Sequence, residues 1–163
     1  MMLGLSLQAF TILHVIISLV AIAAGLVVFY QMLNSQFSPV WTLVFLVTTI
    51  LTSVTGFMFP IAAFTPAIGF GIISLVVLAV ALYALYSQHL AGAWRWIYVV
   101  TALFALYLNV FVLVVQSFQK IPALNALAPK GSEPPFAIAQ AVVLAAFLYF
   151  GYCAVKAFRT RGA

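Results

Sequence analysis

The first 94 residues of the chain contain no Asp, Glu, Lys or Arg. A soluble domain devotes about a quarter of its residues to charge, because its surface must face water. Here charged residues make up 4% of the chain and hydrophobic residues 67%, with a mean hydropathy of +1.30. The chain is therefore expected to lie in a lipid bilayer.

The apolar runs are unbroken and long, which decides between the two structures that can cross a membrane. A crossing helix needs about 20 apolar residues, whereas a barrel strand alternates apolar and polar residues over about 10. The sequence predicts an all-α integral membrane bundle of five transmembrane helices, formed by one domain that covers 1–163. The predicted spans are Ser6 to Leu33, Pro39 to Phe59, Thr65 to Ser87, Ala93 to Phe118 and Phe136 to Phe158.

The connection after the fourth span is the only long one, and it holds four of the seven prolines. Pro122 favours the first turn of a short helix that would end near Ala128 and lie at the membrane interface. Ser132 is then expected to cap the last helix, with Glu133 near the positive end of its dipole. The segment is interpreted as an ordered connector.

The basic residues are unevenly distributed between the two predicted membrane faces: Arg95, Lys156, Arg159 and Arg161 fall on one, and Lys120 and Lys130 on the other. Because Lys and Arg favour the cytoplasmic side, the N-terminus is expected outside and the C-terminus in the cytoplasm. These charges explain the net +5 without a nucleic-acid partner. The start of the chain lacks a signal-peptide pattern, so the first span is expected to be retained.

Few residues of the chain can do chemistry. Glu133 is the single carboxylate, Cys153 is the single cysteine, and His14 and His89 fall at opposite membrane faces. Paired-carboxylate catalysis therefore has no pair to use, and one subunit offers no metal-ligand cluster. No catalytic or metal-binding residue is predicted, and the interpretation favours a non-enzymatic protein.

Polar residues inside the spans are the remaining signal, because in a bilayer they need partners. Helical spacing places one group of them at similar depth in the outer half, and we predict that it forms a ligand-binding site: His14, Thr52, Thr55, Gln116 and Lys120. Gln140 should lie at the same depth, and Phe57, Phe59 and Phe111 should line the pocket. The alternative is that these polar groups only join helices by hydrogen bonds.

Small residues recur at four-residue spacing on two spans, which lets helix backbones approach closely. Ala137, Ala141 and Ala145 do so on the last span, and Ala21 and Gly25 on the first. These faces fit packing inside the subunit or a contact between two copies.

Three blocks of the sequence resemble those of small bacterial inner-membrane proteins without an assigned activity: LTSVTGFMFP (51–60), LAGAWRWIYVV (90–100) and the stretch from Leu108 to Gln140. The resemblance spans most of the chain. It implies a bacterial origin and a multi-pass protein of the inner (cytoplasmic) membrane, and it transfers no mechanism.

The leading interpretation is a membrane protein that binds a lipid-like ligand or a membrane partner complex through its outer half. In it, Lys120 attracts an anionic headgroup, and His14 and Gln116 form hydrogen bonds. The alternative is a redox protein or enzyme that uses quinone or haem, with His14 as a ligand or proton acceptor, although no cofactor is assigned. A third possibility is an accessory subunit or homo-oligomer whose role is to pack against other spans.

Overall fold

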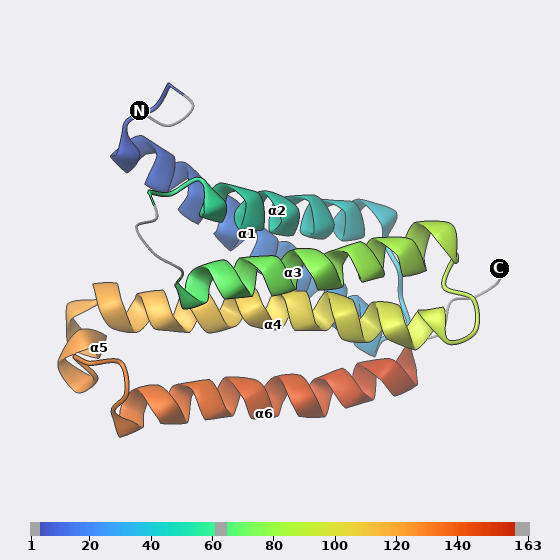
Figure 1. Ribbon diagram of the computed structural model, residues 1–163. Coiled ribbons are helices and arrows are strands. Elements are labelled where there is room, and N and C mark those ends of the chain that lie inside the picture. Colours follow the sequence, from blue (N-terminus) through green and yellow to red (C-terminus); the bar gives the residue numbers. More distant parts are fainter. Residues whose placement is uncertain (1–3, 61–64, 159–163) are drawn as a thin grey trace.

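The computed structural model describes residues 4–60 and 65–158. Over these residues it is a bundle of helices, and five of them are long and apolar enough to cross a membrane. Figure 1 shows their order along the chain. The elements are α1 (Leu7–Leu33), α2 (Pro39–Phe57), α3 (Pro66–Leu82) continued by the π-helical turn η1 (Tyr83–Ser87), α4 (Trp94–Lys120), α5 (Pro122–Leu127) and α6 (Pro134–Ala157).

The long helices run alternately up and down, so the described chain begins and ends at opposite ends of the bundle (Figure 1). We call the end that holds the start of α1 and the short helix α5 the α5 end, and the other the opposite end. The prediction of five helices long and apolar enough to cross a membrane is confirmed, with boundaries that differ by up to two residues except where α3 passes into η1.

Side chains next to the helices explain where several of them begin. The Ser6 hydroxyl accepts the backbone N–H of Ala9 at 3.2 Å, and the Ser38 hydroxyl accepts that of Trp41 at 3.5 Å. Such bonds satisfy donors that the first helical turn leaves free. The other helices except α4 begin at a proline, whose missing N–H costs nothing at that position: Pro66, Pro122 and Pro134.

The connector before α6 is ordered differently from the prediction. Ser132 does not cap α6; the N-cap residue is Glu133. The Glu133 carboxylate accepts the backbone N–H groups of Lys130 and Ser132, each at 3.0 Å. Each carboxylate oxygen accepts one of these donors, so Glu133 joins two backbone positions of the turn with one side chain.

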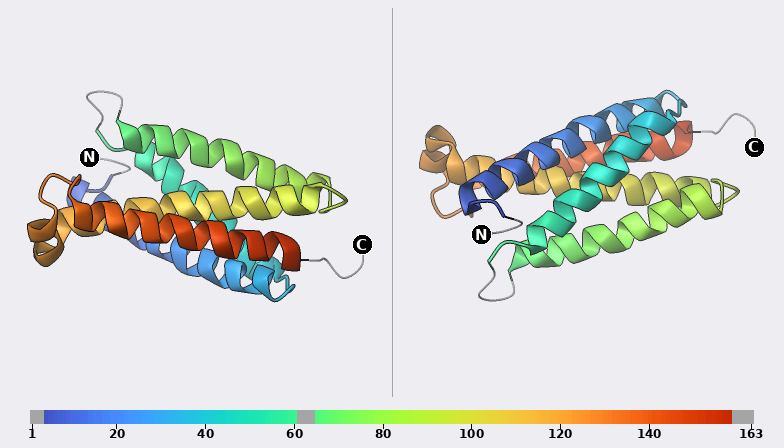
Figure 2. Two further views of the ribbon diagram at one scale, coloured as in Figure 1. Left: turned by 90° about the horizontal axis from the view of Figure 1, so that it is seen from below. Right: turned by 90° about the horizontal axis from the view of Figure 1, so that it is seen from above.

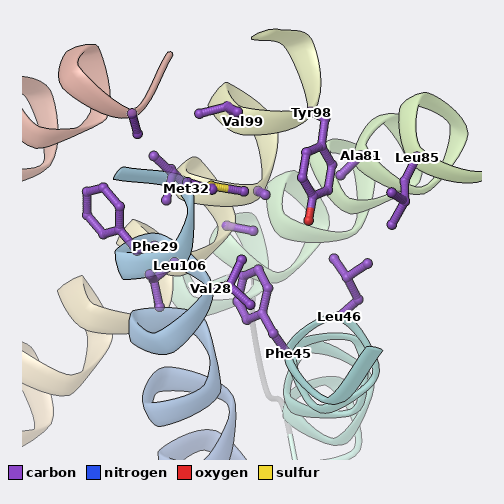
Figure 3. Close-up of a cluster of buried hydrophobic side chains, with 14 of the residues drawn as sticks. Val28, Phe29, Met32, Phe45, Leu46, Ala81, Leu85, Tyr98, Val99 and Leu106 are labelled. Carbon is purple, nitrogen blue, oxygen red and sulfur yellow. The ribbon is translucent and has the colours of Figure 1, made fainter. Parts of the chain in front are cut away.

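The central helix of the bundle is α4, which packs against α1, α3 and α6. Two views along other directions show α2 crossing one side of the bundle and α6 lying on the other (Figure 2). The largest buried cluster lies where α1, α2, α3 and α4 meet, and Figure 3 shows Phe45, Tyr98 and Leu106 within it. Gly25 lies against this cluster, since a Cβ there would come within 2.5 Å of Leu106 and 2.9 Å of Phe45.

The two small-residue faces have different surroundings. Ala21 and Gly25 are buried inside the subunit, between α1 and its neighbours. Ala137, Ala141 and Ala145 are instead exposed on the outer side of α6. Of the residues Pro134 to Ala157, only Gln140 and Ala154 are buried, so α6 contributes little to the interior.

One cation closes the opposite end of the bundle. The Arg95 guanidinium, at the start of α4, donates to the backbone carbonyl of Val155 at 3.3 Å and to that of Phe158. The last carbonyls of a helix have no partner within it. Arg95 therefore both caps α6 and joins it to α4.

Candidate functional site

The centre of the predicted site is a hydrogen bond between the first two helices. Nδ1 of His14 on α1 lies 2.7 Å from Oγ1 of Thr55 on α2. Thr55 is buried and His14 is half-buried. Two residues 41 positions apart are thus joined at the α5 end, as the sequence predicted for this pair.

The surroundings of Thr55 indicate which ring nitrogen of His14 carries the proton. Thr55 Oγ1 also lies 2.6 Å from the carbonyl oxygen of Leu51. A hydroxyl has one proton, and the carbonyl can only accept it. Both contacts are satisfied together when Thr55 donates to Leu51 and His14 donates from Nδ1. Nε2 then keeps a lone pair, and no described residue hydrogen-bonds to it.

Aromatic side chains surround the imidazole on one side. The Phe59 ring meets His14 edge-on, with ring centroids 5.2 Å apart, and meets the fully buried Phe10 at 5.1 Å. Gly56 leaves room beside the ring, because a Cβ there would lie 3.8 Å from Cε1 of His14. Phe59 was predicted to line this site, whereas Phe10 was not predicted to contact it.

The other three predicted site residues do not share this hydrogen bond. The Thr52 hydroxyl donates to the carbonyl of Thr48 within α2, at 2.8 Å. Lys120, the last residue of α4, is exposed, and its charge acts on the His14 ring. Gln116 is exposed one turn before it, and no hydrogen bond joins it to another described residue. The site thus consists of His14 and Thr55, with Lys120 as the nearby cation.

Three further residues expected here pack elsewhere. Phe57 lies against α3, where its ring fills the space that a side chain at Gly71 would need. The amide Nε2 of Gln140 donates to the backbone carbonyl of Phe111 at 3.1 Å, which joins α6 to α4. Gln140 and Phe111 are therefore interhelical contacts, as the alternative interpretation of the polar groups proposed.

A small hollow also lies at the α5 end. Its volume is about 150 Å³, and its lining comes from the end of α4, the turn after α5 and the start of α6: Val115, Phe118, Gln119, Ala128, Pro129, Lys130, Gly131 and Phe136. The Phe118 and Phe136 rings meet edge-on at 5.5 Å. The lining thus combines two aromatic rings with the polar residues Gln119 and Lys130.

The described residues contain no group of three or more His, Cys, Asp and Glu side chains that could hold a metal ion. His89 is exposed in the turn between η1 and α4, at the opposite end from His14. Comparison with protein-family models, with curated proteins and with solved structures gave no match for this chain. The geometry of the site is therefore the basis for any statement about its function.

Proposed function

We propose that this chain is a non-enzymatic multi-pass protein of a bacterial inner membrane that binds a lipid-like anionic molecule at the α5 end. The proposal depends on one observation: the His14–Thr55 hydrogen bond leaves Nε2 of His14 as an acceptor to which no described residue donates, within electrostatic reach of Lys120. A phospholipid headgroup that carries both a phosphate and a hydroxyl has the complementary groups. Lys120 attracts the phosphate, and Nε2 accepts a hydrogen bond from the hydroxyl.

The depth of the site supports this ligand class. His14 is the eighth residue of the 27-residue α1, so it lies about 10 Å from the start of a helix that is about 40 Å long. A hydrocarbon core is about 30 Å thick, which puts the imidazole just below the headgroup level. Phe59, held in place by the buried Phe10, supplies an apolar wall for the upper part of an acyl chain.

Native mass spectrometry of the purified protein in mixed micelles tests the proposal. Phosphatidylglycerol, which has a phosphate and free hydroxyls, should bind in preference to phosphatidylcholine. A lysine near an anionic surface contributes about 1 kcal/mol, so Lys120→Gln should weaken phosphatidylglycerol binding about fivefold, and His14→Phe should also weaken it. Lys130→Gln is the matched control at the same end. Equal binding of both lipids, or equal loss in all three variants, would refute the site.

A redox function is the second candidate, and the tautomer of His14 favours it. A nitrogen with a free lone pair can accept the hydroxyl proton of a quinol or ligate haem iron, while its other nitrogen donates to an orienting partner. An absorption spectrum and a solvent extract of the purified protein distinguish the candidates. A Soret band or bound quinone that disappears in His14→Ala would support the redox function over the lipid function.

The proposed orientation places the N-terminus outside and the C-terminus in the cytoplasm. It is supported by Arg95 and Lys156, which lie at the opposite end. Arg159 and Arg161, which the prediction also counted, lie outside the described residues. Two variants made in a Cys153→Ser background test it by labelling with an impermeant thiol reagent. Lys130→Cys should react from outside intact cells, whereas Lys156→Cys should react only after lysis. The reverse pattern would contradict the proposed orientation.

Packing against other subunits is the remaining proposal for partners. It is supported by α6, whose exposed outer side carries the alanines at positions 137, 141 and 145. Cross-linking in native membranes, followed by mass measurement, would detect a second copy or another protein at this helix. A chain that stays monomeric and uncross-linked would limit its partners to lipids.

A further inference from the structure

The bundle contains buried hydroxyl groups that differ from the other hydroxyls of its helices. Thr48, Thr52 and Thr101 each donate to the backbone carbonyl four residues earlier, at 2.6–2.8 Å. Thr49 and Ser74, which are 0% and 3% exposed, make no hydrogen bond with any described residue. A helix offers every hydroxyl this local acceptor. These two side chains are instead turned toward the neighbouring helices.

A second pair of buried hydroxyls shows which turn of α2 lies beside which turn of α4. The side chains of Thr42 and Tyr98 lie close enough to interact, although no hydrogen bond of ordinary geometry joins their oxygens. Figure 3 shows the Tyr98 hydroxyl pointing toward α2, with Ala81 of α3 drawn next to the ring. The ring contacts Tyr83–Trp94 and Phe70–Phe111 set α3 against α4 and put Ala81 level with Tyr98. These two residues and Thr42 therefore mark one level of the bundle, near its opposite end.

The Thr49 and Ser74 hydroxyls, to which no described residue hydrogen-bonds, lie two helical turns from this level toward the α5 end. Seven residues correspond to about 10.5 Å along a helix and return to nearly the same face. This step leads from Thr42 to Thr49 on α2 and, because α3 runs in the opposite direction, from Ala81 back to Ser74. On α4 it leads from Tyr98 to Ala105, which is 0% exposed and has only a methyl group. This count therefore places the Thr49 and Ser74 hydroxyls at the level of a small side chain.

We propose that water molecules are bound at this level, between Thr49, Ser74 and Ala105. A hydroxyl without a partner in an apolar interior is costly, and hydrocarbon supplies no donor or acceptor. Buried water commonly satisfies such groups when two to four polar partners surround a space large enough for it. Water is favoured over a bound cation because α2, α3 and α4 contain no Asp or Glu to balance the charge. This site is separate from the one at His14.

Labelling by hydroxyl radicals made from water inside the protein tests the proposal in the unmodified chain. Leu78 lies one turn after Ser74 on the buried face of α3 and is 1% exposed, so bulk solvent does not reach it. With water bound at Ser74, brief X-ray irradiation in detergent micelles should oxidise Leu78, as detected by peptide mass spectrometry. An unlabelled Leu78 would overturn the proposal.

Thermal unfolding of two nearly isosteric variants provides an independent measurement. If water bridges the hydroxyls, Thr49→Val and Ser74→Ala should each lower Tm by about 2–4 °C, and the double variant should lose less than the sum. If the hydroxyls are orphans in a dry interface, removing them should leave Tm unchanged or raise it, which would refute the proposal. Thr48→Val is the control, because that hydroxyl already has its partner and Tm should hardly change.

Discussion

Gly25 is the position where an added methyl group should do most harm. Its Cβ would lie 2.5 Å from Cδ1 of Leu106 and 2.9 Å from Cε2 of Phe45. Both neighbours are almost completely buried, at 0% and 1% exposure. They can move aside only by displacing other core side chains.

The magnitude of the effect is the difference between two opposing contributions. Overpacking a close-packed core costs about 1–3 kcal/mol, whereas replacing glycine by alanine inside a helix gains about 0.5–1 kcal/mol. Gly25→Ala should therefore destabilise the fold by about 1 kcal/mol, which corresponds to a fall in Tm of about 2–4 °C for a chain of this size.

Thermal unfolding in detergent micelles, followed by circular dichroism, measures this difference. Gly151→Ala on α6 is the matched control, because its Cβ would make an ordinary van der Waals contact with Leu103 at 3.8 Å. It should leave Tm unchanged or raise it. In a Leu106→Ala background the Gly25→Ala loss should shrink or reverse, since the close neighbour is gone. Equal Tm changes at Gly25 and Gly151 would refute the reasoning.

Three other changes test separate contacts. Gly71→Ala should lower Tm in the unmodified chain and less so with Phe57→Leu, because the new Cβ would lie 2.7 Å from the Phe57 ring. Arg95→Gln should lower the free energy of unfolding by about 1.5–3 kcal/mol, since charged hydrogen bonds to the end of α6 are lost; an unchanged SDS-unfolding midpoint would contradict this. Slight desolvation raises the pKa of Glu133, but backbone N–H groups outweigh it and lower the pKa below the ordinary 4.5. The Glu133 carboxylate should therefore hold the turn above pH 4.5 and release it as the pH falls through the lower pKa of the folded state. The Lys130 amide NMR signal should report this transition, and Glu133→Gln should abolish it.

The five membrane helices could be predicted because their length and apolar character follow directly from bilayer thickness. Proline and serine at the helix starts also placed most boundaries within two residues. The turn before α6 was less predictable, because Ser is a common N-cap residue and Glu is not, yet Glu133 holds that position. The geometry that favours Glu133 depends on two backbone N–H groups that only the folded turn brings together.

The site was predictable only in part, because helical spacing gives the depth of a residue but not the neighbour it faces. His14 and Thr55 were placed together correctly by counting turns from the helix ends. The same counting put Gln140 at this depth, but its amide turns toward the carbonyl of Phe111. The buried hydroxyls of Thr49 and Ser74 were not singled out, although Thr42, Thr49 and Ser53 recur at intervals of seven and four on one face of α2.

The hydrogen bond from Gln140 to the Phe111 carbonyl fixes the axial position of α6 inside the bundle, as the bonds from Arg95 do at its opposite end. Apolar side chains on α6 can slide along α4 at little energetic cost, because lipid solvates them equally well in any axial position. The amide of Gln140 has a hydrogen-bond partner in one axial position of α6 only. A shift of α6 by one residue would leave this amide in hydrocarbon without a partner. During biosynthesis α1 to α4 can pair consecutively as each emerges, whereas α6 must return across the α5 connector. Gln140 inside the bundle and Arg95 at its end then fix the register in which α6 joins the four helices made before it.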